Sequence, residues 1–558
     1  MLLASLQNAP TTYAVAVNSK EKEMWKHAIQ EELNSMRENK VWESVDRPKE
    51  KINGRKPNTI DSRWLFKKKV ETERNIKYKA RLVIRGFKDK NIYDLKETYA
   101  PVSRLSLIRA VISIINKENL EMCQMDVKTE FLYGELNEEI FMEIPNGLEV
   151  SDDMKLSKVC KLKRSLYGLK ISPKKWNKKF SEEVRKLGLE NDLHDPCLFT
   201  WRKNGNIAII ILYVDDMLIA SNNSEKLNQI KNHLSAVFQM KDLGDPKNFL
   251  GMSIERDRKQ RNITIHQAAY TEKVLQKFNM ESCNPQSTPM VTRQVQNRNK
   301  RCKIDTEVLE KTSEVKKVPY REAIGSLMYL ANATRPDIAY AVNYLARKQL
   351  EPTEDDWNDV KRIFRYLRGS IDLGIKSTPE TETLDALTDA SFRDCENSSS
   401  TGGYVIRLFG DVIAWRSHKQ SYVTLSTCQA EYLAMSDACQ ELISLDKSIR
   451  YILGRTMFPV TIWCDNQSAI NFTEMDGSHK LKTFDQSLEN IQKELMLKEK
   501  SGARKHMTDT HGNFIKQCVD DKKIKVLWIK SEENLADIMT KPLPQSAHTY
   551  LRDKIVKM

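Results

Sequence analysis

Two short hydrophobic runs around a polar step form the most distinctive pattern in the chain, within residues 207–221. The run Ile207–Tyr213 is rich in β-branched residues, and a second run, Met217–Ala220, follows two adjacent aspartates, Asp215 and Asp216. Such runs predict the buried strands of a hairpin with the carboxylates at its tip. Because neighbouring carboxylates repel each other, a cation is expected there. For an aspartate pair alone, an ordinary turn is the commoner explanation.

Hydrophobic spacing predicts further helices, and alternation of basic and hydrophobic residues predicts half-exposed strands. The predicted helices cover 25–36, 221–240 and 357–367, and the predicted strands cover 60–70, 78–87 and 262–266. A lone basic strand is usually a solvated surface. Four cations in nine residues, Lys77, Lys79, Arg81 and Arg85, also suit a clamp for a triphosphate if they face the acidic hairpin.

The C-terminal third places four acids on separate predicted elements. Asp389 follows a hydrophobic run, Glu431 opens a predicted helix, Asp465 ends the predicted strand 460–464, and Asp537 follows a last predicted strand. Each acid by itself is an ordinary surface residue.

Length and composition narrow the class of protein. The 558 residues are too many for one core, so two to four domains are expected. The net charge of +14 favours a polyanionic partner, although a merely soluble basic protein is the alternative. The ten cysteines form no CxxC pair, which predicts a reducing compartment and a cytosolic or nuclear location. The longest hydrophobic run, 207–214, is too short to span a membrane, and the first residues lack the features of a signal peptide.

A series of motifs in a fixed order gives these parts a common interpretation. They read KYKARLVIRGF (77–87), ETYAPVSR (97–104), MDVKTEFLYGEL (125–136), SLYGLK (165–170), YVDDM (213–217), KDLG (241–244), GSLMYL (325–330) and TRPDIAYAV (334–342). Together they resemble the reverse transcriptase of copia-type LTR retrotransposons, over roughly residues 20 to 550. The resemblance implies an α/β (α+β) fold with fingers, palm and thumb in 1–290, a linker and helical connection in 291–380, and a ribonuclease-H-like domain in 381–558.

The resemblance also implies roles for individual residues of the polymerase. Asp126, Asp215 and Asp216 would be its catalytic, metal-binding carboxylates, with two Mg²⁺ in the site. The substrate-binding residues would be Lys79 and Arg81 against the triphosphate, Phe131 beneath the sugar as a gate against a 2′-OH, and Tyr167, Gly168 and Lys170 near the nucleotide and template. The expected partners are an RNA template, a DNA primer and dNTPs, without a membrane, and the sequence leaves self-association open.

The motifs TDAS (388–391), AEY (430–432), CDN (464–466) and NLAD (534–537) resemble the ribonuclease H domain of the same elements. By that resemblance Asp389, Glu431, Asp465 and Asp537 would hold two Mg²⁺ and cleave the RNA of an RNA–DNA hybrid. The expected function is therefore RNA-directed DNA polymerase with ribonuclease H, which copies retrotransposon RNA into DNA. We expect the protein in cytoplasmic virus-like particles or in the nucleus.

Three departures from the family pattern keep a second interpretation open. Ile171 replaces a usual glutamine, Glu130 replaces a usual small residue, and a Lys/Glu-rich stretch over 474–504 looks like a helical insertion. A glutamate at 130 would place negative charge near the triphosphate, so we hypothesise that this chain polymerises poorly; the competing view is that Glu130 points to solvent or recruits a cation. In the alternative interpretation, the chain is a catalytically impaired, truncated remnant that only binds nucleic acid. The seven intact carboxylates argue against this alternative.

Overall fold

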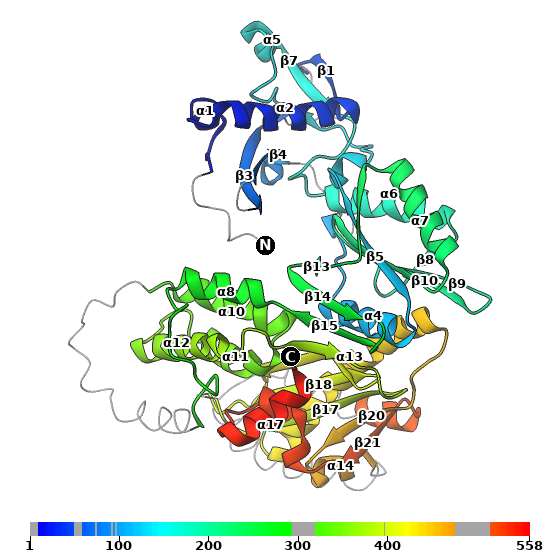
Figure 1. Ribbon diagram of the computed structural model, residues 1–558, viewed down its shortest axis with the longest axis vertical. Coiled ribbons are helices and arrows are strands. Elements are labelled where there is room, and N and C mark those ends of the chain that lie inside the picture. The colour runs from blue at the N-terminus through cyan, green and yellow to red at the C-terminus, as the bar shows by residue number, and fades with distance from the viewer. Residues whose placement is uncertain are drawn as a thin grey trace, which may run out of the picture. The chain divides into compact units, whose positions relative to one another are not determined.

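The computed structural model describes residues 9–48, 59–72, 75–90, 93–94, 98–292, 318–395, 397–474 and 514–557. The chain divides into two compact units, whose elements are labelled in Figure 1. Unit 1 comprises residues 1–103 and 121–246, and unit 2 comprises residues 104–120 and 247–558. These units differ from the predicted domains, because residues 104–120 and 247–290 belong to unit 2 with the C-terminal part of the chain. The predicted domain boundaries stay a prediction.

The N-terminal part of unit 1 combines an amphipathic helix with a small sheet and a long hairpin. Its elements are α1 (Tyr13–Val17), α2 (Lys22–Glu38), β1 (Trp42–Asp46), β2 (Thr59–Ile60), β3 (Ser62–Thr72), β4 (Asn75–Ile84), η1 (Gly86–Lys88), η2 (Glu130–Tyr133), β6 (Phe141–Met142), α5 (Asp152–Ser157) and β7 (Lys158–Leu162). The sheet order is β1-β7-β6-β2, and β3 pairs with β4. Helix α2 buries Trp25, Ile29 and Leu33, the face that the spacing predicts. The predicted helix and both predicted strands are therefore confirmed.

A six-stranded sheet with order β12-β5-β11-β10-β9-β8 forms the rest of unit 1. Its elements are β5 (Glu121–Val127), α6 (Ser172–Lys186), β8 (Glu190–Asn191), β9 (Leu198–Lys203), β10 (Asn206–Tyr213), β11 (Asp216–Ser221), α7 (Ser224–Val237) and β12 (Met240–Gly244). Alternate residues of β5, β10 and β11 form one hydrophobic core with Trp176 and Phe180 of α6 and Ile230 of α7. The predicted hairpin is confirmed as β10 and β11, which lie at the centre of this sheet.

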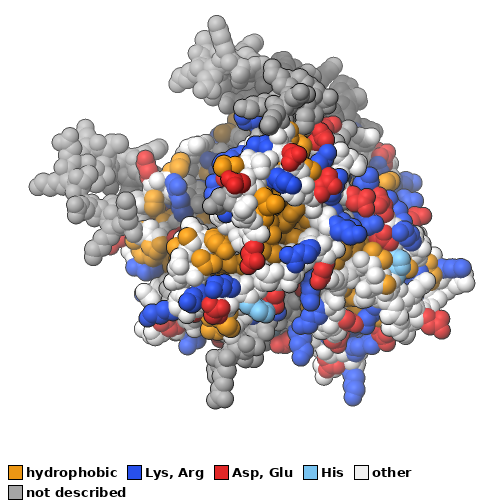
Figure 2. Space-filling model, turned by 90° about the horizontal axis from the view of Figure 1, so that it is seen from above, with side chains coloured by type: hydrophobic (Ala, Val, Ile, Leu, Met, Phe, Trp, Pro, Cys, Tyr) orange, Lys and Arg blue, Asp and Glu red, His pale blue; other side chains and the backbone are white. Residues whose placement is uncertain are grey.

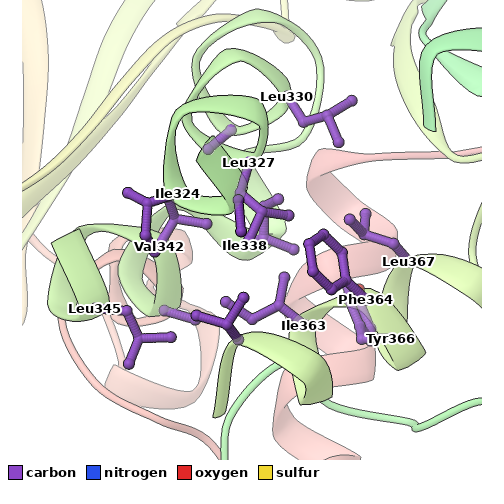
Figure 3. Packing of buried hydrophobic residues seen from close by; sticks show 14 of the residues in the cluster. Ile324, Leu327, Leu330, Ile338, Val342, Leu345, Ile363, Phe364, Tyr366 and Leu367 are labelled. Carbon is purple, nitrogen blue, oxygen red and sulfur yellow. The ribbon is translucent and has the colours of Figure 1, made fainter. Parts of the chain in front are cut away.

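The first part of unit 2 packs helices around a second hydrophobic core. Its elements are α4 (Leu105–Lys117), β13 (Asn248–Phe249), β14 (Met252–Asp257), β15 (Asn262–His266), α8 (Ala268–Lys277), α10 (Tyr320–Ala333), η3 (Pro336–Ile338), α11 (Ala339–Ala346), α12 (Glu354–Arg368) and β16 (Gly374–Ser377). Figure 3 shows Ile324 and Leu327 of α10 facing Val342 of α11 and Phe364 of α12. The predicted helix over 357–367 is thus confirmed.

Helix α4 is held in unit 2 by a buried arginine. The guanidinium of Arg109 donates to the carbonyl oxygens of Ile413 (2.6 Å), Asn332 (3.0 Å) and Ala333 (3.0 Å). Its central carbon also lies 3.9 Å from the ring centroid of Trp415. Burial lowers the pKa of Arg109 to about 9. Because a buried charge is costly unless it is hydrogen-bonded, these contacts fix the position of α4.

The C-terminal part of unit 2 is a five-stranded sheet with order β19-β18-β17-β20-β21. Its elements are β17 (Leu384–Ser391), β18 (Thr401–Leu408), β19 (Asp411–Lys419), α13 (Thr427–Leu453), β20 (Val460–Cys464), α14 (Gln467–Glu474), β21 (Ile524–Trp528), η4 (Ser531–Glu533), η5 (Leu535–Met539) and α17 (Gln545–Ile555). Strands β17, β18 and β19 are antiparallel, whereas β17, β20 and β21 are parallel. The predicted strand 460–464 is confirmed as β20.

Two predictions fall outside the described residues: most of the linker over 291–317 and of the insertion over 474–504. Within the described part of the chain, no helix combines the length and hydrophobicity needed to cross a membrane.

Candidate active sites

The tip of the β10–β11 hairpin brings the first three predicted acids together. Tyr213 pairs with Asp216 at the end of the hairpin, and Asp216 in turn lies opposite Asp126 of β5. The turn forces Val214 into a left-handed conformation with φ of 59°. A β-branched residue there is strained, and such strain is typical of functional turns. The turn therefore places Asp215 beside two directly paired aspartates.

Hydrogen bonds to the main chain fix this turn. The N–H of Val127 donates to the carbonyl oxygen of Asp215 (3.1 Å), and the indole N–H of Trp176 donates to that of Val214 (2.7 Å). The amide of Gln124 donates to a carboxylate oxygen of Asp216 (3.3 Å). All three aspartates are half-buried. Their backbone is thus set by the sheet, while their carboxylates stay within reach of solvent and could bind a divalent cation.

An aromatic and charged cluster lies in the same unit around Tyr167. The rings of Phe131 and Tyr167 meet edge to face with centroids 4.9 Å apart. The guanidinium of Arg81 lies 4.5 Å from the centroid of Tyr167 and 3.8 Å from a carboxylate oxygen of Glu32. The structure therefore brings together Arg81, Phe131 and Tyr167, three of the predicted substrate-binding residues.

Glu130 does not point to solvent, so that part of the competing interpretation is wrong. Its side chain is buried, and one carboxylate oxygen accepts a hydrogen bond from the hydroxyl of Tyr167 (2.8 Å). Burial, and then the charge of Asp215, raise the pKa of Glu130 to about 7. Near neutral pH a substantial fraction of Glu130 is therefore protonated, which weakens the negative charge that the sequence places near the triphosphate.

The other predicted substrate-binding residues lie at the edges of this cluster. Gly168 has φ of 96°, and a Cβ there would collide with the carbonyl oxygen of Ile84, so only glycine fits. The ammonium of Lys170 donates to the carbonyl oxygen of Asp89 (3.4 Å). Lys79 is exposed and lies opposite Lys67, on the same face of the hairpin as Arg81. Arg85 instead pairs with Asp61 (2.9 Å), so this residue is neutralised within unit 1.

The four C-terminal acids converge at one edge of the five-stranded sheet. Parallel pairing of Leu387 with Trp463 places Asp389 and Asp465 each two residues further on, at the same edge. Glu431 lies in the first turns of α13, and Asp537 lies in η5. Gly403 is paired with Asp389, and a Cβ on it would come within 2.6 Å of Met539, so its small size lets η5 approach the sheet.

Two groups of potential metal ligands share Asp465. One contains Asp389, Asp465 and Asp537, and the other contains Glu431, Cys464 and Asp465, each with ligand atoms within 4.8 Å of one another. Burial raises the pKa of Asp389, Glu431 and Asp537, with the neighbouring carboxylates adding to the shift in Glu431 and Asp537. Among the described residues, one carboxylate oxygen of Glu431 and one of Asp537 are buried without a hydrogen-bond partner. Crowded, buried and incompletely bonded oxygens of this kind fit a divalent cation.

Comparison with known proteins bears on the first site. Residues 39–292 match the family described as reverse transcriptase (RNA-dependent DNA polymerase), and this stretch includes Asp126 and the Asp215–Asp216 pair. The chain contains a reverse transcriptase domain.

The similarity extends well beyond that domain. The chain is 36% identical over 548 residues to the retrovirus-related Pol polyprotein from transposon TNT 1-94 of Nicotiana tabacum, which covers 98% of this chain and 39% of that protein. It is 30% identical over 544 residues to the corresponding polyprotein from transposon RE2 of Arabidopsis thaliana, covering 97% of this chain and 34% of that protein. The predicted relation to copia-type Pol polyproteins is thus confirmed, and the chain spans little more than a third of their length.

Solved structures also share similarity with the chain. The structure of the foamy viral protease-reverse transcriptase in complex with RNA/DNA hybrid aligns with a TM-score of 0.44 and 13% identity, covering 93% of this chain and 55% of that one. A second foamy viral protein, in complex with double-stranded DNA, aligns with a TM-score of 0.46 and 12% identity, covering 91% and 70% of the two chains. The mixed helix and sheet content of the reverse transcriptase domain agrees with the predicted α+β class.

The structure adds residues that the sequence argument missed. Trp176 holds the turn at Val214 through its indole N–H. In the sequence it fits the amphipathic pattern of α6, so the pattern predicts only a core residue. Lys541 lies 3.0 Å from a carboxylate oxygen of Asp537 and 3.6 Å from one of Asp389. Thr540 donates a hydrogen bond to Asp389. The four-residue spacing between Asp537 and Lys541 was the available signal for this contact.

Proposed function

We propose that the chain is an RNA-directed DNA polymerase with ribonuclease H activity, of the kind carried by copia-type Pol polyproteins. The observation that carries the polymerase assignment is the pairing of Asp126 with Asp216 beside Asp215, within the reverse transcriptase domain. Three carboxylates on rigid strands are a suitable site for cations that bind a nucleoside triphosphate.

In this proposal Asp126, Asp215 and Asp216 would hold two Mg²⁺ where the primer 3′-OH and the triphosphate meet. When bound, the metal ions would stabilise the charge on the attacking and leaving oxygens. Arg81 and Lys79 would neutralise the triphosphate, and the edge-to-face rings of Phe131 and Tyr167 would form the surface beneath the sugar. Trp176 would hold the turn, so that the acids keep their places through the reaction.

The proposed partners are an RNA template, a DNA primer, their hybrid and dNTPs. The net charge of +14 supports a polyanionic partner. On the face shown in Figure 2, however, lysine and arginine side chains are interspersed with acidic ones, so net charge alone does not locate the nucleic acid. Titration of an RNA–DNA hybrid at several salt concentrations tests binding, because log affinity should fall with log salt by about 0.9 per phosphate contacted on a duplex. A flat profile would refute a nucleic-acid partner.

Ribonuclease H activity is proposed for the acids at the edge of the five-stranded sheet. Asp389, Glu431, Asp465 and Asp537 would hold two Mg²⁺ at the scissile phosphate of the RNA strand, and the hybrid would be recognised by its backbone and shape. The two ligand groups that share Asp465 support this proposal. Asp465→Asn should abolish RNA cleavage while hybrid binding persists; cleavage at the parental rate would refute the metal site.

Primer extension with Mg²⁺ on the purified chain is the decisive experiment for the polymerase. We expect extension by the parent, no extension by Asp215→Asn, and normal extension by Glu225→Gln, a control at an exposed acid. Extension by Asp215→Asn would refute the site. If the parent is inactive, Glu130→Ala tests the impaired-remnant hypothesis, because rescue through a lower KM for dNTP would show that Glu130 is the cause.

A further inference from the structure

A lysine side chain lies in only one of the two groups of potential metal ligands. The ammonium of Lys541 is 3.0 Å from a carboxylate oxygen of Asp537 and 3.6 Å from one of Asp389, which belong to the same group. The second group, with Glu431 and Cys464, has no such ion pair among the described residues. The two groups therefore differ in charge although they share Asp465.

This contact differs from an ordinary surface ion pair. The carboxylates are buried, with side-chain exposures of 4% for Asp389 and 10% for Asp537, whereas the side chain of Lys541 is 37% exposed. Two neighbouring buried carboxylates are costly without a cation. Although burial opposes the charge of Lys541, Asp389 and Asp537 raise its pKa, so the ammonium stays charged there.

The position of Lys541 also allows it to leave. Its side chain is 37% exposed, so a rotation of the flexible stem would move the ammonium into water. A divalent cation between Asp389 and Asp537 would meet a positive charge in the same space, and only one of the two can occupy it.

We propose that Lys541 is a built-in counter-ion of the Asp389–Asp465–Asp537 group, which stabilises these acids without metal and must be displaced when a divalent cation binds there. The inference rests on the metal-binding role proposed above for these acids, but not on RNA cleavage. Lys541 is thus a positioning residue whose removal strengthens metal binding most in the group that contains Asp389 and Asp537.

The test is a calorimetric titration with Mn²⁺ in an Asp215→Asn/Asp216→Asn background, so that the heats report the C-terminal acids. We compare the parent with Lys541→Met, which keeps the length but removes the charge, and with Lys541→Arg, which keeps the charge. Lys525→Met, at an exposed residue of β21, is the matched control. Asp465→Asn, which alters the residue common to both groups, should weaken all C-terminal binding.

We expect Lys541→Met to lower the Kd of one Mn²⁺-binding event by about tenfold or more. The Kd values of Lys541→Arg and Lys525→Met should stay near those of the parent. Without metal, the Tm of Lys541→Met should fall, and saturating Mn²⁺ should raise it by more than it raises the Tm of the parent. Unchanged or weaker Mn²⁺ binding by folded Lys541→Met would overturn the proposal. Because these readouts do not use RNA, tight binding without cleavage would refute the nuclease assignment and leave the counter-ion intact.

Discussion

Asp126, Asp215 and Asp216 of unit 1 are half-buried, whereas Asp389 and Asp537 of unit 2 are buried beside Lys541. In unit 1 the acids are positioned by strand pairing and by main-chain hydrogen bonds, so that solvent can screen their charges. In unit 2 the acids come from elements far apart in the sequence, and burial adds to their repulsion. The first arrangement is preorganised by the backbone, and the second depends on compensating charge.

The largest expected effect is that a single substitution in one site abolishes one of the two reactions and spares the other. Asp216→Asn should lower primer extension by about a thousandfold or more and leave RNA cleavage within a factor of about two, because it removes one proposed metal ligand from the first site only. Asp389→Asn should do the reverse. Rates of both reactions, measured on the same preparations, test this; loss of both activities in either variant would show that the sites are not independent.

A second prediction concerns pH and the buried acid of unit 1. The pKa of Glu130 rises from 4.5 to about 7 on folding, so the folded protein binds this proton more tightly than the unfolded chain. The resulting stability is fully present below pH 4.5 and is lost as the pH rises through 7. Glu130→Gln should remove this dependence, on the order of 2 to 3 kcal/mol between pH 5 and pH 8.

Urea unfolding at both pH values gives the comparison for Glu130. The exposed Glu225→Gln should follow the parent. If the parent and Glu130→Gln lose the same stability between pH 5 and pH 8, Glu130 does not carry a raised pKa.

A third prediction concerns repulsion in unit 2. Burial, and then the charges of Asp389 and Asp465, raise the pKa of Glu431 well above the usual value. Glu431→Gln should stabilise the metal-free protein by about 1 to 2 kcal/mol at pH 8, whereas Asp215→Asn should change stability little. Thermal unfolding with chelator measures both. Destabilisation by Glu431→Gln would mean that the charge repulsion at Glu431 contributes less to the free energy of unfolding than its other contacts do.

The smallest effect tests the backbone control of unit 1. Trp176→Phe keeps an aromatic side chain but leaves the carbonyl of Val214 without its indole donor, at a cost of about 1 to 2 kcal/mol. Primer extension should fall by about tenfold while RNA cleavage is unchanged. Trp201→Phe, on β9, is the control. Equal extension by the two variants would show that strand pairing alone holds the turn.

The two sites also differ in how well the sequence predicts them. The hairpin carries its acids on adjacent residues, so the hydrophobic pattern alone locates Asp215 and Asp216 at its tip. The C-terminal acids are spread from 389 to 537, and only a resemblance of motifs groups them. The bond between Tyr167 and Glu130 was not predicted, because a side-chain contact between distant segments leaves no periodic signal. Lys541 was missed although it lies four residues after Asp537, because that spacing alone does not mark a functional contact.

Helix α4 limits how the chain can be divided. Its buried Arg109 relies on carbonyls of residues 332, 333 and 413, all beyond the predicted polymerase domain of 1–290. A fragment ending near 290 would carry the helix without these acceptors, and would expose hydrophobic residues that are buried in the whole chain. The two proposed activities are therefore separable by point substitution but not by truncation. Removal of the C-terminal third should therefore make the polymerase fragment insoluble, in addition to removing the proposed ribonuclease H activity.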